Sequence, residues 1–374
     1  MSVSNCNGCK VCELIDLAYH KQLEYKQKQV KNMYPDNTVF PIIESDDYLG
    51  YRHKNQVPLI KDKGKVKYGV YQPKSHKLLH VPDCPIHHQK ANEIFALISK
   101  LIIKHKIEIY NEDSKVGLIR YLFVRVGAKT QELLVALVVA KDFFPKKKDF
   151  IDDLLKEIPE ITTIVLNINN RKDSMVLADK ERILYGPGYI MDTLAGYKFK
   201  ISSTSFFQIN PKQAEKLFIK AIDLAELKGN EVVLDAYCGI ATMSILLSKK
   251  VKKVIAVDNN KAAILDGKNN LIINSINNVK IYCSDALAFL KKNSEKFEVV
   301  FLDPTRNGCE KELLFQLIKM KVRKIVYIAC DIKTQKRDVD FLKSKGYTIT
   351  TIQPLDMFCS TKHIENIVVL KKNQ

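Results

Sequence analysis

The sequence lacks an apolar stretch long enough to cross a membrane. Its longest uninterrupted apolar run extends from Leu133 to Ala140, whereas a transmembrane helix needs roughly 20 such residues. The N-terminal residues MSVSNCNGCKVCELID also lack the apolar core of a signal peptide. We therefore expect neither secretion nor membrane insertion, and a cytoplasmic location.

The chain also lacks an internal repeat, a low-complexity linker and a Gly/Ser-rich hinge. Its 374 residues are enough for two or three domains. Apolar residues make up 46% and charged residues 27% of the chain, which is typical of a soluble globular protein and excludes a disordered one. Any domain boundary must be inferred from the rhythm of the predicted elements alone.

Acidic residues are scarce relative to basic ones. The chain has 60 Lys and Arg against 42 Asp and Glu, which gives a formal net charge of +18. Such a surplus favours a polyanionic partner, of which nucleic acid is the commonest. The alternative is compositional drift, because Lys, Ile and Asn are abundant throughout, as in proteins of AT-rich genomes.

The cysteine pattern indicates a metal site. Nine cysteines, an odd number in a chain without an export signal, argue against a disulfide framework. Cys6, Cys9 and Cys12 form a C-x2-C-x2-C run that lets one loop direct three thiolates at one centre. An iron–sulfur cluster needs a fourth thiolate, for which Cys84 in VPDCPIHH is the best candidate. Zinc on four cysteines, or three unrelated thiols, are the alternatives.

The first part of the chain, to about residue 205, predicts an α+β domain. Helices are expected at 13–34 and at 92–106, the second with Asn92 as its N-cap. Strand patterns dominate the rest and predict a mainly antiparallel sheet. These patterns lie at 51–60, 65–73, 117–127, 132–142, 161–169, 181–191 and 197–203.

After about residue 206 the pattern changes to alternating strands and helices. Asn210 and Pro211 predict the first helix, as an N-cap followed by proline at the first helical position. The alternation predicts a doubly wound, mostly parallel sheet of seven strands. The strands are expected at 231–238, 252–258, 278–285, 297–304, 324–330, 347–356 and 365–372.

Acidic residues end three successive strands of this second domain. Asp235 lies in the first, Asp258 ends the second and Asp285 follows the third. Gly239 allows a tight turn after the first strand, but the pattern G-x-G-x-x-G and a Walker Lys-Ser/Thr are both missing. Each acid alone is more often a helix N-cap. Together they favour a nucleoside pocket without a phosphate cradle, and S-adenosylmethionine, a cation, is the ligand that fits.

The next strand ends carry candidates for catalysis. Asp303 is followed by proline, which gives an extended backbone at the pocket rim. Cys330 ends the fifth strand, where a cysteine facing a helix N-terminus can act as a nucleophile; burial as a small apolar residue is the alternative. Glu365 stands just before the last apolar strand.

These residues resemble a known family. The segments SFFQIN (205–210), VLDAYCG (233–239), FLDPTRNG (301–308), YIACD (327–331) and MFCSTKHIENIVVL (357–370) are similar to those of the S-adenosylmethionine-dependent RNA uracil-5-methyltransferases. Upstream, CNGCKVCELIDLAYHKQLEYK, YRHKNQV and VPDCPIHH resemble the iron–sulfur-containing members that act on 23S ribosomal RNA. The resemblance covers nearly the whole chain.

The resemblance implies a role for each matching residue. Cys330 would attack C6 of the target uracil, Glu365 would remove the C5 proton, and Asp303 would orient the uracil or the surroundings of the nucleophile, with Arg306 a second candidate for stabilising the enolate. The expected cofactor contacts are Gln208, Tyr237, Gly239, Asp258, Asp285 and Asp303. Cys6, Cys9, Cys12 and Cys84 would hold a [4Fe–4S] cluster.

The expected partner is RNA, with 23S ribosomal RNA as substrate and neither DNA nor a membrane involved. The same chemistry on the T-loop uridine of transfer RNA is the first alternative. The cysteine run counts against it, because the bacterial relatives specific for transfer RNA usually lack the cluster. The second alternative is a catalytically inactive RNA-binding protein in which the cluster only stabilises the fold.

The sequence departs from the family in five respects. Asp331-Ile332 replaces the usual Asn-Pro after the nucleophile, which leaves open the local turn and the hydrogen bond that Asn would give the uracil. Thr305 replaces a second proline, and Asp258 replaces the usual glutamate. Cys6 and Cys9 are closer together than usual. Because the sequence starts at the cysteine run, we expect the protein to lack the N-terminal RNA-binding barrel of some relatives, as the shorter ribosomal-RNA subgroup does.

The remaining cysteines and two histidines have plainer interpretations. Cys238, Cys283 and Cys309 beside strand ends are expected to be packing residues. His87 and His88 are expected to lie in a solvated loop, with metal ligation as the less favoured alternative.

Overall fold

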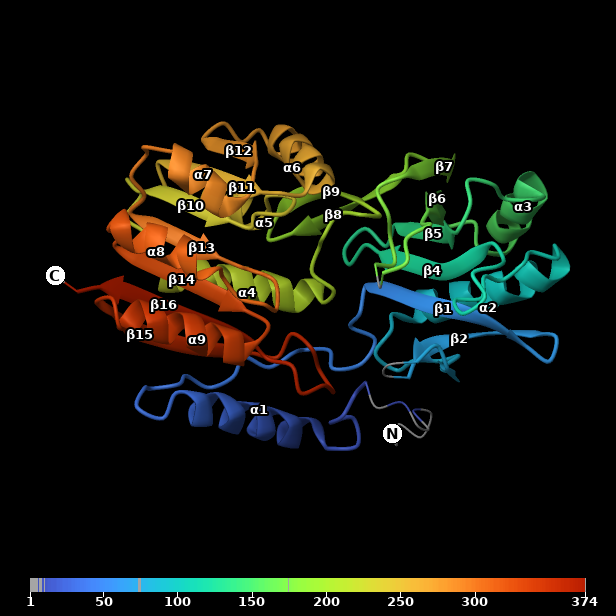
Figure 1. The fold of residues 1–374 in the computed structure, drawn as a ribbon, viewed down its shortest axis with the longest axis horizontal. Coiled ribbons are helices and arrows are strands. Elements are labelled where there is room, and N and C mark those ends of the chain that lie inside the picture. Colours follow the sequence, from blue (N-terminus) through green and yellow to red (C-terminus); the bar gives the residue numbers. More distant parts are fainter. Residues whose placement is uncertain (1–5, 7–8, 10, 73–74, 174, 374) are drawn as a thin grey trace. The chain divides into compact units, whose positions relative to one another are not determined.

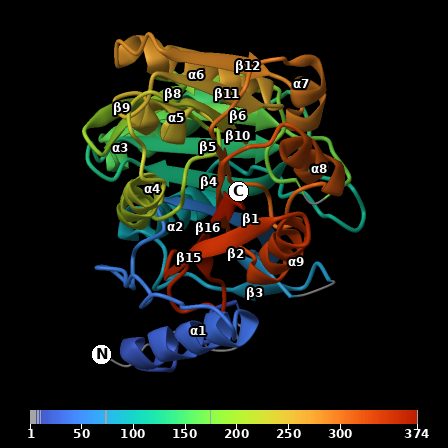
Figure 2. The same ribbon diagram turned by 90° about the vertical axis from the view of Figure 1, so that its left-hand side faces the viewer.

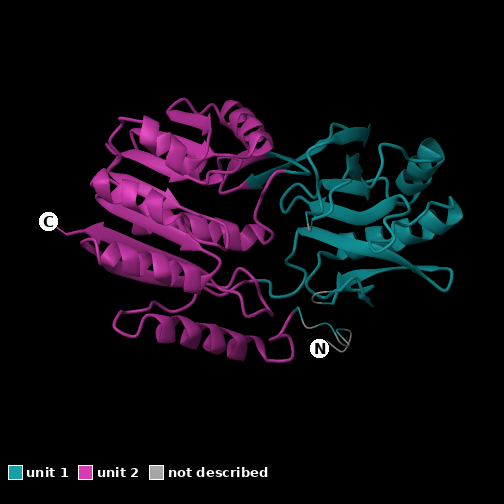
Figure 3. Ribbon diagram, in the orientation of Figure 1, with its two compact units in different colours: residues 1–11, 47–193, 200–204 teal, residues 12–46, 194–199, 205–374 magenta. Residues whose placement is uncertain are grey.

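The computed structural model describes residues 6, 9, 11–72, 75–173 and 175–373. Its chain forms two compact units, coloured separately in Figure 3. Unit 1 contains residues 1–11, 47–193 and 200–204, and unit 2 contains residues 12–46, 194–199 and 205–374. Each unit has its own sheet and its own apolar core. Within the described part of the chain, no helix is both long and apolar enough to cross a bilayer.

Unit 1 is built on a seven-stranded sheet in the order β3-β2-β1-β4-β5-β6-β7. The strands are β1 (Lys54–Asp62), β2 (Lys65–Tyr71), β3 (Leu78–His80), β4 (Ile119–Val126), β5 (Leu133–Val139), β6 (Ile161–Ile168) and β7 (Glu181–Tyr185). All neighbouring pairs are antiparallel except β5 and β6, which are parallel. A parallel pair needs a crossover connection, and helix α3 (Lys147–Glu157), which the sequence analysis missed, lies within it.

The core of unit 1 lies between this sheet and helices α2 (Gln89–Lys104) and α3. Alternate residues of β5, from Leu133 to Val139, pack with Ile94, Phe95 and Ile98 of α2 in one apolar cluster. The predicted helix at 92–106 was wrong at its start, because α2 begins three residues earlier. His88 is its N-cap and accepts a hydrogen bond from the Lys90 backbone N–H.

The predicted strand at 181–191 is divided into β7 and β8 (Tyr189–Leu194) by a turn. Gly186 in that turn has a φ of 70°, and a Cβ there would stand 2.1 Å from the Thr162 carbonyl oxygen, so only glycine fits. β8 pairs with β9 (Tyr197–Ser202) in a separate two-stranded sheet. Pro73, the last residue of the predicted strand 65–73, lies outside the described residues.

Unit 2 contains the predicted doubly wound sheet, in the order β12-β11-β10-β13-β14-β16-β15 (Figure 1). Its strands are β10 (Val232–Ala236), β11 (Lys253–Asp258), β12 (Val279–Cys283), β13 (Val299–Leu302), β14 (Lys324–Ala329), β15 (Tyr347–Leu355) and β16 (Glu365–Lys372). The first five are parallel, and β16 runs antiparallel to both β14 and β15. The order reverses between β10 and β13, where ligands bind in such sheets.

Helices cover both faces of the unit 2 sheet. They are α4 (Pro211–Leu224), α5 (Thr242–Leu247), α6 (Lys261–Ile273), α7 (Ala286–Lys292), α8 (Lys311–Lys319) and α9 (Ile332–Lys343). In Figure 2, α7, α8 and α9 line one side of the sheet and α4 lies on the other. Apolar side chains of α7, α8 and α9 form the main core of the unit with those of the strands. As predicted, Asn210 caps α4 and Pro211 is its first residue.

The segment 12–46, which the sequence analysis grouped with the N-terminal part, packs within unit 2. It contains helix α1 (Tyr19–Met33), whose Val30 joins the unit 2 core. The Lys26 ammonium is fully buried and lies 2.5 Å from Asp356 Oδ1. Burying these charges as a pair ties α1 to the end of β15. Further along the chain, residues 194–199 also belong to unit 2, and residues 200–204 return to unit 1 before unit 2 resumes at Ser205.

Candidate active site

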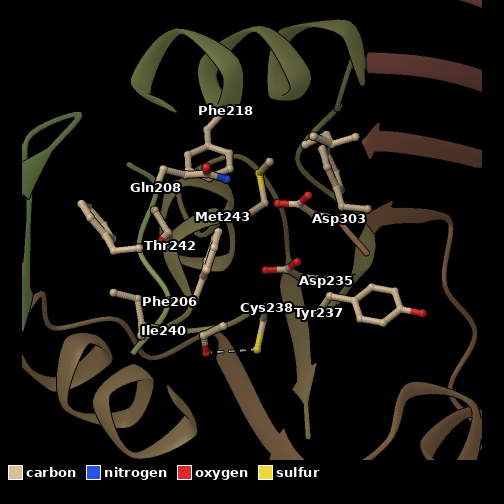
Figure 4. Close-up of a pocket in the computed structure, with 14 residues that line it drawn as sticks. Phe206, Gln208, Phe218, Asp235, Tyr237, Cys238, Ile240, Thr242, Met243 and Asp303 are labelled. Carbon is tan, nitrogen blue, oxygen red and sulfur yellow. Dashed lines mark hydrogen bonds between the residues drawn. The ribbon is translucent and has the colours of Figure 1, made fainter. Parts of the chain in front are cut away.

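A pocket in unit 2 opens at the carboxyl ends of β10 and β13 (Figure 4). Four of the six predicted cofactor residues line it: Gln208, Tyr237, Gly239 and Asp303. Much of its wall is formed by residues that were not among the predicted site residues, among them Phe206, Phe218, Thr242 and Met243. Phe206 lies within SFFQIN, and Thr242 and Met243 follow VLDAYCG closely, whereas Phe218 of α4 had no motif signal.

Two carboxylates point into this pocket. Asp235 and Asp303 both project toward its centre (Figure 4), and the Ser244 hydroxyl donates to Asp235. Burial raises the pKa of Asp235 to about 7, although the Ser244 bond lowers it. Burial and the nearby Asp235 raise the pKa of Asp303 to about 7. A cation in the pocket would favour the ionised form of both groups, so the residues fit the sulfonium of S-adenosylmethionine.

The turn after β10 has an unusual backbone. Tyr237 and Ala241 have φ values of 76° and 66°, which is rare for residues other than glycine and is common at functional sites. The Gly239 N–H donates to Asp258 Oδ2 at 2.9 Å, and so the second strand end fixes the first turn. The Tyr237 ring points away from the two carboxylates in Figure 4, and its hydroxyl lies 4.0 Å from Cys309 Sγ.

Asp258 and Asp285, also predicted to contact the cofactor, stand beside the pocket. Asp258 Oδ1 accepts from the Asn260 N–H at 2.8 Å, so each of its oxygens already binds one backbone N–H. Asp285 caps α7 through the Ala288 N–H at 2.8 Å, and its charge contributes to the raised pKa of Tyr237. Asp285 therefore has the capping role that was weighed for it, whereas Asp258 caps no helix, since Asn260 is the N-cap of α6. Cys238, expected only to pack, is buried in that wall.

The structure brings Cys330 and Glu365 together. The register pairs Ala329 of β14 with Asn366 of β16. The neighbours of that pair, Cys330 and Glu365, therefore lie at the same end of two adjacent antiparallel strands. They are 35 positions apart in the sequence, and only the sheet pairing explains their proximity.

Burial and charge dominate the electrostatics of this pair. Burial, Glu365 and Asp303 together raise the pKa of the Cys330 thiol to about 11, while a hydrogen bond and the positive charge of Arg306 lower it. Burial and Asp303 also raise the pKa of Glu365 well above its usual range, and Arg306 again opposes the shift. Arg306 is thus the cation that faces both groups. In the sequence, Arg306 is recognisable by its position three residues after Asp303.

Two buried amides hold the strand that carries Glu365. The Gln335 side-chain amide of α9 donates to the carbonyl oxygens of Tyr327 and Asn366, both at 2.9 Å. The Asn366 side chain donates back to Gln335 Oε1 at 2.7 Å. α9 therefore fixes β14 and β16 to each other next to the site, which the sequence analysis did not predict.

Asp331 caps the helix that follows Cys330. Its carboxylate accepts from the N–H groups of Lys333 and Thr334, at 2.9 and 3.2 Å, and so it caps α9. Asp and Asn are about equally good N-caps because both offer a side-chain oxygen. Ile332 takes the first helical position in place of proline.

The predicted cluster residues are divided between the units. Cys6, Cys9 and Cys84 belong to unit 1, and Cys12 belongs to unit 2. The Cys9 N–H donates to the Cys6 carbonyl oxygen at 3.0 Å, and Cys9 contributes to the raised pKa of Cys84. Among the residues that the structure describes, no three His, Cys, Asp or Glu side chains gather in a metal-binding arrangement.

The two histidines next to Cys84 have structural partners, and so the expected solvated loop was wrong. His87 Nδ1 lies 3.2 Å from Asn92 Oδ1, and burial lowers its pKa to about 4. His88 caps α2 as described above. Asn92, predicted as the cap, instead donates from within the helix to Asp83 at 2.9 Å and to the Cys84 carbonyl oxygen at 3.1 Å.

Known proteins share this architecture. A solved structure of tRNA (uracil-54, C5)-methyltransferase from Pyrococcus abyssi, in complex with S-adenosyl-L-homocysteine, matches with a TM-score of 0.81 and 28% sequence identity. The match covers 96% of this chain and 85% of that one.

Relatives in sequence have consistent names. An uncharacterized RNA methyltransferase of Clostridium acetobutylicum is 39% identical over 375 residues, which is 97% of this chain and 82% of the relative. One of Clostridium tetani is 36% identical over 370 residues, which is 97% of this chain and 80% of that relative. The family model described as tRNA (Uracil-5-)-methyltransferase matches residues 18–373. The chain therefore belongs to the tRNA (uracil-5-)-methyltransferase family and is an RNA methyltransferase.

Proposed function

We propose that the protein methylates C5 of a uridine in 23S ribosomal RNA. The observation that carries the chemistry is the grouping of Cys330, Glu365, Asp303 and Arg306 at one end of the unit 2 sheet. C5 of uracil is a poor nucleophile, so the reaction needs a covalent nucleophile, a group that stabilises developing charge and a separate base. These four residues supply all three.

Each residue has one task in this scheme. The Cys330 thiolate adds to C6 of the uracil, and the electron pair of the C5–C6 bond moves toward the C4 carbonyl oxygen, which makes C5 nucleophilic. S-adenosylmethionine, when bound, supplies the methyl group that C5 acquires. Glu365 then removes the C5 proton, the C5–C6 double bond re-forms and the bond from Sγ to C6 breaks. Arg306 stabilises the negative charge, on the thiolate before attack and after release and on the enolate in between, and Asp303 orients the uracil.

The target base has to leave its stack to reach Cys330, as enzymes acting on bases generally require. The positive net charge of the protein favours contacts to the RNA backbone. The choice of 23S ribosomal RNA rests on the cysteine pattern Cys6, Cys9, Cys12 and Cys84. A transfer RNA T-loop uridine is the second candidate, favoured by the likeness to the Pyrococcus abyssi enzyme.

The test is a parallel assay with labelled S-adenosylmethionine on unmodified 23S RNA and unmodified transfer RNA. Nuclease digestion and mass spectrometry identify the labelled nucleoside. We expect label in 5-methyluridine from 23S RNA, and none with Cys330→Ala. Label in transfer RNA alone would transfer the assignment to the second candidate, and an active Cys330→Ala variant would refute the covalent mechanism.

The [4Fe–4S] cluster remains a separate proposal, carried by the spacing of the cysteines. No step of the methyl transfer uses it. We expect protein purified without oxygen to contain iron and acid-labile sulfide in equal amounts, and Cys84→Ala to lose both. Cys283→Ala, at an exposed cysteine on β12, is the matched control. Zinc in place of iron, or no metal, would refute the cluster.

A further inference from the structure

The loop between β13 and α8 carries Arg306 on an exposed stretch of chain. Residues 305–307 are exposed, so burial of their side chains does not fix the backbone. A turn within the loop is closed by the Gly308 N–H, which donates to the Thr305 carbonyl oxygen at 2.9 Å. This turn sets the local shape of the loop and does not set its distance from Cys330. Other contacts must do so.

One face of α9 provides such contacts. The Thr334 hydroxyl donates to the Arg306 carbonyl oxygen at 3.0 Å, and it also lies 3.2 Å from the Asp331 carbonyl oxygen. The Arg337 guanidinium donates to the Asn307 carbonyl oxygen at 3.0 Å. Thr334 and Arg337 are three residues apart and therefore lie on the same face of the helix.

Asp338, the next residue on that face, anchors the end of the loop. Its Oδ2 accepts from the Cys309 N–H at 2.8 Å and from the Tyr327 hydroxyl of β14 at 2.6 Å. Gly308 has a φ of 75°, and a Cβ there would stand 2.6 Å from Asp338 Oδ2 and 2.7 Å from Arg337 Nη2. The positive φ favours glycine, and a Cβ would displace the ends of the two side chains that hold the loop.

The elements that hold the loop also hold the nucleophile. β14 ends at Ala329, directly before Cys330, and α9 begins at Ile332, two residues after it. We infer that Thr334, Arg337 and Asp338 are positioning residues that fix the Arg306 loop against Cys330. This inference rests on the proposed function, because it gives Arg306 its task beside the nucleophile.

The charged groups facing Cys330 are Glu365 of β16, Asp303 and Arg306. The two acids disfavour the thiolate and Arg306 alone favours it. A loop that moves away from α9 takes Arg306 with it and leaves the two acids in place. The thiolate then becomes harder to form, which a merely structural role of α9 would not predict.

The test measures the alkylation rate of Cys330 in the full-length protein as a function of pH, with iodoacetamide and mass spectrometry of the Cys330 peptide. Arg306→Gln should raise the apparent pKa by about one unit, which slows alkylation about tenfold at a pH below the pKa. Thr334→Val should slow alkylation about threefold, since the hydrogen bond from the Thr334 hydroxyl to the Arg306 carbonyl oxygen is lost. Thr334→Ser keeps the hydroxyl and should restore the rate. Thr350→Val, on β15, is the matched control.

Arg337→Gln gives an independent check, because it removes the hydrogen bond to the Asn307 carbonyl oxygen. It should also raise the pKa of Cys330. All variants are compared at equal folded fraction, established by thermal unfolding. An unchanged Cys330 pKa in both Thr334→Val and Arg337→Gln would overturn the inference. An unchanged Cys330 pKa in Arg306→Gln would also overturn it, since Arg306 would then have no effect on the thiol that its position could control.

The alkylation measurement needs neither RNA nor S-adenosylmethionine. A result that overturns this inference is therefore distinct from a result that overturns the proposed function. The proposed function fails when Cys330→Ala retains methylation. With active enzyme, Thr334→Val should lower kcat and leave the KM for RNA within about twofold.

Discussion

At the residue scale, the site is governed by buried charge. Asp235, Asp303 and Glu365 all have pKa values raised chiefly by burial, and they lie near one another. Such a concentration of acid destabilises a free protein near neutral pH and is suited to binding a cation. Arg306 is the counter-charge that faces Cys330 and Glu365.

Asp303→Asn should make the protein more stable and inactive. The folded protein keeps the proton of Asp303 up to a pKa of about 7, whereas the ordinary value is 3.8. The contribution that neutral Asp303 makes to the stability of the folded protein is fully present below pH 3.8, the pKa of an ordinary aspartate. This contribution is lost as the pH rises through the pKa of about 7 in the folded protein. The variant should therefore exceed the wild type in melting temperature by about 1–3 °C at pH 8 and match it near pH 4. A difference independent of pH would contradict this account.

Asp331→Asn should leave stability and activity close to those of the wild type, because both side chains cap α9 with one oxygen. Asp331→Ala removes the cap and should lower the free energy of unfolding by about 1 kcal/mol. Urea unfolding measures the stability and a methylation assay measures the activity. Loss of activity in Asp331→Asn would show that the carboxylate has a role beyond capping.

At the element scale, α1 is the least expected part of the fold. It lies far from the sheet of unit 2 in the sequence and is held against it by Lys26, which contacts Asp356 and the Phe358 carbonyl oxygen. The Gln22 side chain adds a bond from the Ser360 N–H at 2.9 Å. These contacts order the segment that leads into Glu365, and α1 therefore belongs to the catalytic unit.

Lys26→Met should lower the free energy of unfolding by about 3–5 kcal/mol, because it leaves the buried Asp356 without its cation. The matched control is Lys21→Met on the same helix, whose pair with Glu24 is exposed and should contribute less than about 1 kcal/mol. Urea unfolding of the two variants separates a buried from an exposed ion pair. Equal effects would mean that the Lys26 pair is not desolvated in solution.

At the scale of the whole molecule, the net charge of +18 should make RNA binding strongly dependent on salt. Raising KCl from about 50 mM to about 200 mM should weaken binding about tenfold or more, because counterions are released when phosphates are neutralised. A filter-binding titration at several salt concentrations gives the slope. An affinity that does not change with salt would mean that the basic surplus is compositional drift.

The sequence by itself determined the doubly wound sheet of unit 2, because alternating strand and helix patterns leave few topologies. It also predicted a ligand pocket at the strand ends that carry Asp235 and Asp303, since the ends of parallel strands meet at one edge. Gln208 and Tyr237 were expected there only from the motif resemblance. The motif resemblance added the roles of Cys330 and Glu365.

Only the tertiary structure decided what depends on contacts between distant segments. Strand pairing placed Cys330 beside Glu365, burial set their pKa values, and the Lys26–Asp356 pair joined α1 to unit 2. The tethers from Thr334, Arg337 and Asp338 to the Arg306 loop likewise leave no periodic signal. A local pattern records which face of an element is buried, whereas the partner that buries it is fixed only when the chain is folded.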